Sequence, residues 1–94
     1  MFKKKKTNEI DISWVMVSPN VHTRIGPDEV IDAIERHCRQ DWGNLCDHDK
    51  AQNERALQTG GRIFSTYRSS KGRMFWIITE GQERRTTVLM PEDY

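Results

Sequence analysis

The chain has 94 residues, of which 35% are hydrophobic and 31% are charged, so it has room for one domain with a small core. Its 15 basic and 14 acidic side chains give a net charge of +1, but four of the lysines lie together at Lys3–Lys6. Without them, 11 basic residues face 14 acidic ones, a net charge of about −3 that argues against a strongly basic nucleic-acid-binding domain. No apolar run approaches the ~18 residues of a membrane span, and two cysteines are too few for a disulfide scaffold. We therefore expect a cytoplasmic protein without membrane attachment.

The N-terminal part of the chain predicts an arm followed by a strand. Residues 1–9 (MFKKKKTNE) are typical of a flexible basic arm, and residues 10–94 predict a single domain. Apolar residues alternate from Ile10 to Val17, which predicts a strand. Its second half is apolar on both faces, so we expect it to lie in the interior of a sheet or to be covered on both sides. Ser18-Pro19-Asn20 is expected to end it.

Two helices are predicted in the middle of the chain. Pro27, Asp28 and Glu29 form a strong helix start, and the helix is expected to run to about Gln40. Its inner stripe consists of Val30, Ile31, Ala33, Ile34, His37 and Cys38. Asp41-Trp42-Gly43-Asn44 interrupts the pattern and predicts a tight corner. A second helix begins near Asp47 or Asp49, which are suited to capping it, and runs to about Thr59 before Gly60-Gly61.

The remainder predicts a three-stranded meander over Arg62–Arg68, Arg73–Thr79 and Thr86–Met90, with Pro91 ending the last strand and Glu92-Asp93-Tyr94 left as a short tail. The middle strand is apolar on both faces and is therefore expected to be central. The fold class that follows is α+β, a β-α-α-β-β-β two-layer domain with the helices packed on one face of an antiparallel meander. We expect a core formed by Trp14, Met16, Ile31, Ile34, Leu57, Ile63, Trp76, Ile78 and Leu89.

The corner predicts a structural unit formed by Asp41, Trp42, Gly43 and Asn53. Trp42 has enough apolar area to close one end of a small core, and Gly43 can adopt the positive φ that a chain reversal needs. Asn53 lies on the inner stripe of the second helix, where its amide needs buried partners such as the backbone of the corner.

The residues His37, Cys38, Cys46 and His48 form the one ligand-like cluster of the sequence. Thiolates and imidazoles are zinc ligands, but the spacing matches none of the usual zinc knuckles. The favoured interpretation is buried thiols and half-exposed histidines without a metal, and zinc binding or a disulfide stays open. No catalytic constellation and no cofactor motif is found, so neither catalytic residues nor a cofactor are predicted.

Arginines and aromatic residues alternate in the meander and suggest a binding face. A sheet surface of this kind can contact phosphates through arginine and stack bases on aromatic rings. Edge charges that discourage aggregation are the favoured explanation of the same arginines, and binding is the alternative. The candidate binding residues are Arg62, Tyr67, Arg68, Arg73, Arg84 and Arg85.

Five segments resemble a family of small bacterial proteins from plasmids, integrated conjugative elements and prophage-like regions: DWGNL (41–45), NERAL (53–57), GGRIFSTYR (60–68), FWIITE (75–80) and TTVLMPEDY (86–94). The resemblance covers about residues 27–94 and implies a setting on a mobile element without an established activity. Members of that family are labelled "plasmid-related protein" or "type I restriction endonuclease subunit M". The second label does not suit this chain, because the Gly-rich nucleotide-binding sheet of a methyltransferase does not fit in 94 residues.

The element order also resembles the RelE/ParE-type toxins, which cleave ribosome-bound mRNA or bind gyrase. Arg62, Arg68, Arg73 and Tyr94 are the positions that match the arginines and the C-terminal tyrosine of those toxins. We expect a non-enzymatic accessory protein of a mobile element that binds a macromolecule, protein or nucleic acid. A RelE/ParE-like toxin or ribonuclease is the alternative, and the oligomeric state is left open.

Overall fold

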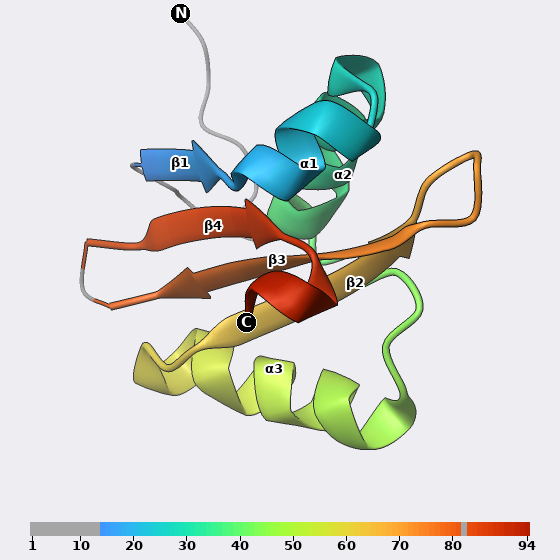
Figure 1. The fold of residues 1–94 in the computed structure, drawn as a ribbon. Helices are drawn as coiled ribbons and strands as arrows, with labels where there is room; N and C mark the ends of the chain where they lie inside the picture. Colours follow the sequence, from blue (N-terminus) through green and yellow to red (C-terminus); the bar gives the residue numbers. More distant parts are fainter. Residues whose placement is uncertain (1–13, 82) are drawn as a thin grey trace, which may run out of the picture.

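The computed structural model describes residues 14–81 and 83–94 and shows an α+β fold with helices packed against a four-stranded mixed sheet. The predicted arm over residues 1–9 and the first four residues of the predicted strand lie outside the described residues. Figure 1 shows the elements in the chain order β1 Trp14–Val17, α1 Pro19–Arg24, α2 Pro27–Cys38, α3 Asp47–Thr59, β2 Ile63–Arg68, β3 Met74–Glu80, β4 Arg85–Leu89 and the 3₁₀ turn η1 Pro91–Asp93. The expected α+β class, with helices packed against the sheet, is confirmed.

The sheet has the strand order β1-β4-β3-β2. The meander β2-β3-β4 is antiparallel, with Ile63 paired to Thr79 and Glu80 paired to Arg85, and β3 is central as predicted. β1 joins it as a parallel neighbour of β4, with Val17 beside Val88. The sheet is therefore mixed. The connection between the parallel strands β1 and β4 contains three helices and two strands, and parallel neighbours require such a long connection.

Both predicted helices agree with the structure to within two residues, and a third helix, α1, was not predicted. α2 begins at Pro27 and α3 ends at Thr59, where Gly60 adopts the left-handed conformation at φ 81°. The short helix α1 begins directly after β1. The Ser18 Oγ accepts a hydrogen bond from the N–H of Val21, and Pro19 occupies the first turn. Ser-Pro was interpreted as the end of a strand, but the same pair is also an N-cap followed by a first-turn proline.

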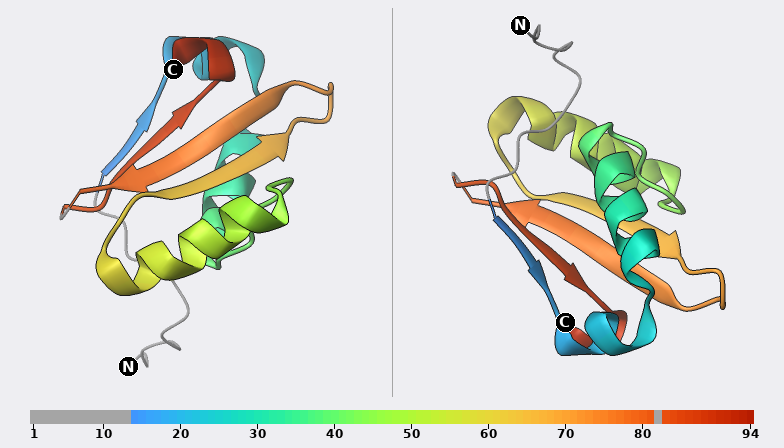
Figure 2. Two further views of the ribbon diagram at one scale, coloured as in Figure 1. Left: turned by 90° about the horizontal axis from the view of Figure 1, so that it is seen from below. Right: turned by 90° about the horizontal axis from the view of Figure 1, so that it is seen from above.

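The main core lies between the sheet and the helices α1 and α2, whereas α3 lies beside β2 (Figure 2). The main cluster contains Val21, Ile25, Val30, Ala33, Tyr67, Phe75, Ile77, Val88 and Met90. A smaller cluster under α3 contains Trp42, Leu45, Ala56 and Ile63.

The expected core is correct in part. Ile63, Ile78 and Leu89 are buried, and Ile34, Leu57 and Trp76 are partly buried. The prediction of burial was wrong for Trp14, Met16 and Ile31, because each is more than half exposed. The expectation that β1 lies in the interior of the sheet was also wrong. β1 is an edge strand, and its apolar side chains are exposed on both faces.

Candidate binding site

The structure divides the predicted binding arginines between two ends of the sheet. Arg68 and Arg73 lie at the end where β2 turns into β3, since Arg68 pairs with Met74. Arg62 and Arg84 lie at the opposite end, where the Arg84 guanidinium donates to the carbonyl O of Gly61 at 3.4 Å. Arg85 belongs to the same end and forms an ion pair of 3.7 Å with Glu83. The six predicted residues therefore do not form one continuous face.

Tyr67 is corrected from a binding residue to a core residue. Its side chain is 2% exposed, and its hydroxyl donates to the carbonyl O of Asp41 at 2.7 Å. Burial raises the pKa of this phenol. Tyr67 and the neighbouring Phe75 both point toward α2, so neither ring is available to a ligand. The sequence alternation identified the aromatic residues of the meander but not the face that the helices cover.

Three other aromatic side chains form a connected group on the opposite side of the sheet. The rings of Phe64 and Trp76 meet edge to face at 5.1 Å, and those of Trp76 and Tyr94 at 5.7 Å. Arg62 joins them, because its guanidinium donates to the Tyr94 hydroxyl at 3.0 Å and lies 5.9 Å from the centre of the Phe64 ring. We call Arg62, Phe64, Trp76 and Tyr94 the aromatic group.

The aromatic group lines a pocket of about 660 Å³ beside α3. The helix contributes the opposite wall with Asp49, Gln52, Asn53, Arg55, Ala56 and Thr59. Two guanidinium groups, Arg55 and Arg62, and one side-chain carboxylate, Asp49, line this pocket, so the side chains that line it carry a net charge of +1. A pocket with aromatic rings and a net positive charge suits a ligand that is both planar and anionic.

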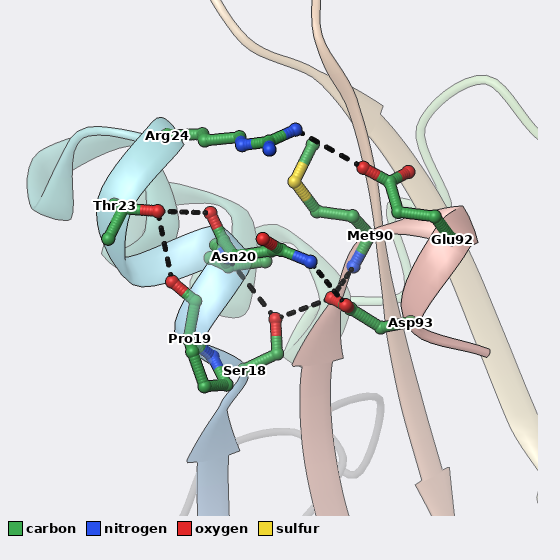
Figure 3. Close-up of polar contacts among 9 residues, drawn as sticks. Ser18, Pro19, Asn20, Thr23, Arg24, Met90, Glu92 and Asp93 are labelled. Atoms are coloured by element: carbon green, nitrogen blue, oxygen red, sulfur yellow. Dashed lines mark hydrogen bonds and ion pairs between the residues drawn. The ribbon is translucent and has the colours of Figure 1, made fainter.

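Tyr94 reaches the pocket because the residue before it, Asp93, is held by the start of α1 and by the backbone of Met90. The Asp93 carboxylate accepts hydrogen bonds from the Ser18 hydroxyl at 2.7 Å, the Asn20 amide at 2.6 Å and the N–H of Met90 at 3.0 Å (Figure 3). These bonds, led by that from Met90, hold the pKa of Asp93 below its usual range. Arg24 and Glu92 add an ion pair of 3.4 Å. We call the contacts of Asp93 the C-terminal clasp.

The corner residues and Asn53 meet at the outer edge of β2. The Asn53 side chain forms two hydrogen bonds with the backbone of Phe64: its amide donates to the carbonyl O at 2.7 Å, and its Oδ1 accepts from the N–H at 3.0 Å. The partner differs from the expected one, since Asn53 pairs with the strand rather than with the corner. Two residues further along β2, the backbone N–H of Thr66 donates to the carbonyl O of Trp42 at 3.2 Å, and the carbonyl O of Thr66 accepts from the N–H of Asn44 at 2.8 Å. The edge of β2 is thus paired at Phe64 and at Thr66.

Asp41 fixes the entry to this corner. Its carboxylate forms an ion pair with Arg36 at 2.9 Å and accepts from the N–H of Gly43 at 3.2 Å. The hydrogen bond from Arg36 lowers the pKa of Asp41. Trp42 is buried beside Leu45 and Ile63, in the smaller cluster. All four residues of the predicted unit therefore serve the contact between the corner, α3 and β2.

The His/Cys cluster is dispersed. His37 is fully buried beneath the sheet, where its ring nitrogens pair with the hydroxyls of Ser65 and, at 2.9 Å, Thr79. Cys38 is partly buried, and Cys46 is exposed, contrary to the expectation of buried thiols and half-exposed histidines. Within residues 14–81 and 83–94, no three His, Cys, Asp or Glu side chains are placed to hold a metal ion.

Of the aromatic group, only Arg62 was among the predicted binding residues; Phe64, Trp76 and Tyr94 were not. The signal for Phe64 was its place two residues after Arg62, on the same side of a strand. Tyr94 carries no such signal, because its position depends on bonds between the two ends of the described chain.

Comparison of the chain with protein-family models, curated proteins and solved structures finds no match. Among the described helices, none has the length and apolar character required to cross a membrane.

Proposed function

We propose that the chain is a non-enzymatic binding protein and that its pocket beside α3 receives an unpaired nucleotide of a single-stranded nucleic acid. The observation that carries the proposal is the connected group of Arg62, Phe64, Trp76 and Tyr94 on the wall of this pocket. Stacking of a base on an aromatic side chain contributes about 1–3 kcal/mol and is tolerant of sequence. The guanidinium groups of Arg55 and Arg62 are suited to the phosphates of the same strand.

The electrostatics of the pocket favour an anionic ligand over a cationic one. Arg62 already lies over the rings of Phe64 and Tyr94, at 5.9 and 5.5 Å from their centres. An ammonium ligand would have to displace this guanidinium and overcome its repulsion. A nucleotide instead gains a stacking surface and a positive charge at the same place, which supports the nucleic-acid interpretation.

A setting on a mobile genetic element is retained as part of the proposal. It rests on the family resemblance stated above. Two of the resembling segments, DWGNL and GGRIFSTYR, contain the corner, β2 and the pocket residues Gly61, Arg62 and Phe64. A pocket on such a protein would serve the handling of single strands that arise during transfer or replication of the element.

The test is binding of fluorescently labelled single-stranded RNA and DNA measured by anisotropy. Tyr94→Ala is the informative variant, since Tyr94 is 73% exposed and its loss leaves the core intact. We expect Tyr94→Ala and Arg62→Ala each to weaken binding about tenfold, equivalent to about 1.4 kcal/mol. Arg39→Ala is the matched control, because Arg39 is an exposed arginine at the end of α2 that does not line the pocket, and it should bind as the wild type does. Equal affinity of Tyr94→Ala and Arg39→Ala would contradict the proposal.

The contact between Arg62 and Tyr94 also favours a second candidate, a toxin-like ribonuclease. These are two of the four positions that match the RelE/ParE-type toxins, and the structure brings them to 3.0 Å. The other two, Arg68 and Arg73, lie at the far end of β2 and β3. Electrophoresis of the RNA after the binding experiment separates the candidates: intact RNA agrees with a binding protein. Cleavage that Tyr94→Phe abolishes, together with growth arrest on induced expression, would establish the ribonuclease.

A further inference from the structure

The two edge strands of the sheet, β2 and β1, differ in whether other parts of the chain hydrogen-bond their outer edge. The edge of β2 is paired by the Asn53 side chain at Phe64 and by the corner at Thr66. At the other edge, β1 hydrogen-bonds β4 and no other strand among residues 14–81 and 83–94. Strand edges without cover recruit other strands, and proteins usually protect them with charges, prolines or bulges.

β1 carries none of these protective features. Its four residues Trp14, Val15, Met16 and Val17 are uncharged and apolar, and their side chains are 60%, 42%, 53% and 40% exposed. They account for four of the six large hydrophobic side chains that are exposed in the described chain. The concentration of apolar surface on one edge strand indicates an interaction surface.

The direction of the backbone groups shows which residues of β1 are free to pair. The N–H of Ser18 donates to the carbonyl O of Val88 in β4 at 2.9 Å. Backbone groups of successive residues point to opposite edges of a strand, so Met16 also points toward β4. The N–H and C=O groups of Val15 and Val17 therefore point outward, away from the sheet.

We propose that β1 pairs with β1 of a second copy of this chain, antiparallel, about a twofold axis at Met16. In this register Val15 of one copy and Val17 of the other exchange both of their hydrogen bonds, and the symmetric pair does the same. The two Met16 side chains meet on one face, and the valines meet on the other. No charged side chain of β1 faces another, so the strand is complementary to itself. The result is one sheet that continues through both copies.

A second copy suits this edge better than an unrelated strand because the pairing residues repeat in reverse order. Val-Met-Val is the same sequence read in both directions, so the twofold at Met16 places valine opposite valine without any register shift. A partner of different sequence would need to match both faces of β1 separately. The described strand is short, so we expect a reversible dimer of moderate affinity.

The test is sedimentation velocity over protein concentrations from ~10 μM to ~1 mM, where a dimer of moderate affinity is expected to form. Val15→Pro removes an N–H that points outward and leaves the bonds to β4 in place, so it should raise the dimer dissociation constant at least about tenfold. Val15→Lys should act in the same way and guards against misfolding of the proline variant. Ile31→Lys is the matched control, since Ile31 is also an exposed apolar residue, at 57% against 42% for Val15, but lies on α2. It should leave the dimer intact.

Crosslinking provides an independent measurement. Opposed residues at a non-hydrogen-bonded antiparallel position have Cα atoms about 4.5 Å apart, within the range of a disulfide. Met16→Cys should therefore form a covalent dimer under mild oxidation, and Ile31→Cys should form none beyond the background of the wild type. A chain that stays monomeric at all concentrations would overturn the proposal. So would a dimer that Ile31→Lys dissociates as readily as Val15→Pro.

Discussion

His37 shows how a titratable side chain is accommodated in the core. Its two ring nitrogens pair with Ser65 and Thr79, and the Thr79 hydroxyl continues to Thr86 at 2.8 Å. These hydroxyls satisfy the neutral ring, but they offer no carboxylate to balance a charged one. Burial therefore lowers the pKa of His37 to about 4.

We expect the protein to lose stability as the pH falls from about 6.5 to about 4. The unfolded chain takes up a proton on His37 near pH 6.5, whereas the folded chain does so only near pH 4. Protonation thus favours the unfolded state, and the full loss is about 3 kcal/mol. Urea denaturation at several pH values measures it.

His37→Gln is the control for this prediction, because glutamine can donate and accept hydrogen bonds and does not titrate. Its stability should be lower at neutral pH and should fall less across the same window. The lowered pKa values of Asp41 and Asp93 add a loss of stability at the acidic end of this window, but both proteins contain these residues, so the difference between them reports His37. A wild-type slope equal to that of His37→Gln would show that the imidazole is solvated in the native state.

Asn53 is expected to matter for stability far more than its exposed neighbour. Asn53→Ala leaves the N–H and C=O of Phe64 without their partners at the edge of β2, at a cost of about 2–3 kcal/mol. Gln52→Ala, one residue away and exposed, should cost less than about 0.5 kcal/mol. Thermal and urea unfolding measure both. Normal stability of Asn53→Ala with a loss of nucleic-acid binding would make Asn53 a ligand contact.

Single residues were predictable from the sequence where local pattern decides their place. The stripe of α2 included Val30, Ala33 and His37, and all three are buried. The same stripe included Ile31, which is exposed because α2 packs on the sheet through a narrower face than its apolar residues cover. Apolar alternation in β1 likewise does not distinguish burial within the fold from exposure at an edge.

At the scale of elements, the corner and β2 act as one unit through close backbone contact. Gly43 has a φ of 74°, and a Cβ added there would collide with the carbonyl O of Thr66 and the ring of Tyr67. Gly60 has a similar φ of 81° but open space around it. This pair separates the cost of the backbone conformation from the cost of the collision.

We expect Gly43→Ala to destabilise the protein by clearly more than Gly60→Ala. The backbone conformation costs each variant about 1 kcal/mol, and Gly43→Ala additionally has to separate the corner from β2. Unfolding in urea gives both values. Equal losses would mean that the corner moves away from the strand at little cost.

The C-terminal turn is expected to control the pocket from outside it. Asp93→Ala removes the acceptor of the bonds from Ser18, Asn20 and Met90, and so releases Tyr94 from its place against Trp76. Oligonucleotide affinity should fall toward that of Tyr94→Ala. Asp32→Ala, which removes an exposed carboxylate on α2, is the control for the change in charge. Unchanged affinity of Asp93→Ala would separate the clasp from binding.

Elements defined by local signals were predicted except α1, whose Ser-Pro signal also fits the end of a strand, and pairings defined by distant contacts were not predicted. Proline marks the start of α2, glycine marks the end of α3, and alternation of apolar residues marks the strands of the meander. Each signal lies within a few residues of the element. The parallel pairing of β1 with β4 joins residues 71 positions apart, as at Trp14 and Arg85, and carries no local signal. The clasp that places Tyr94 has the same origin, with Ser18 and Asp93 as its ends.

For the whole molecule, the proposed dimer has a geometric consequence for the pockets. A twofold axis perpendicular to a sheet keeps the same face of both copies on the same side. Trp76 lies on the face opposite α2, so both aromatic groups would line one surface of the continuous sheet. Seven strand spacings separate the two copies of β2, a distance of about 34 Å at about 4.8 Å per spacing.

This arrangement predicts that long single strands bind the dimer more tightly than short ones. At no less than about 3.4 Å per nucleotide, a strand of ~24 nucleotides reaches both pockets, whereas one of ~4 nucleotides reaches one. Linked binding at two sites typically raises affinity by 10² to 10⁴. Val15→Pro keeps each pocket but removes the pairing of β1. In this variant a long strand should bind more tightly than a short one only because it offers more positions at which a single pocket can bind. The affinity ratio of long to short strands, measured for wild type and variant above the dimer dissociation constant, decides the point. Equal ratios in the wild type and in Val15→Pro would contradict the prediction, because they would show that a long strand does not span the two pockets.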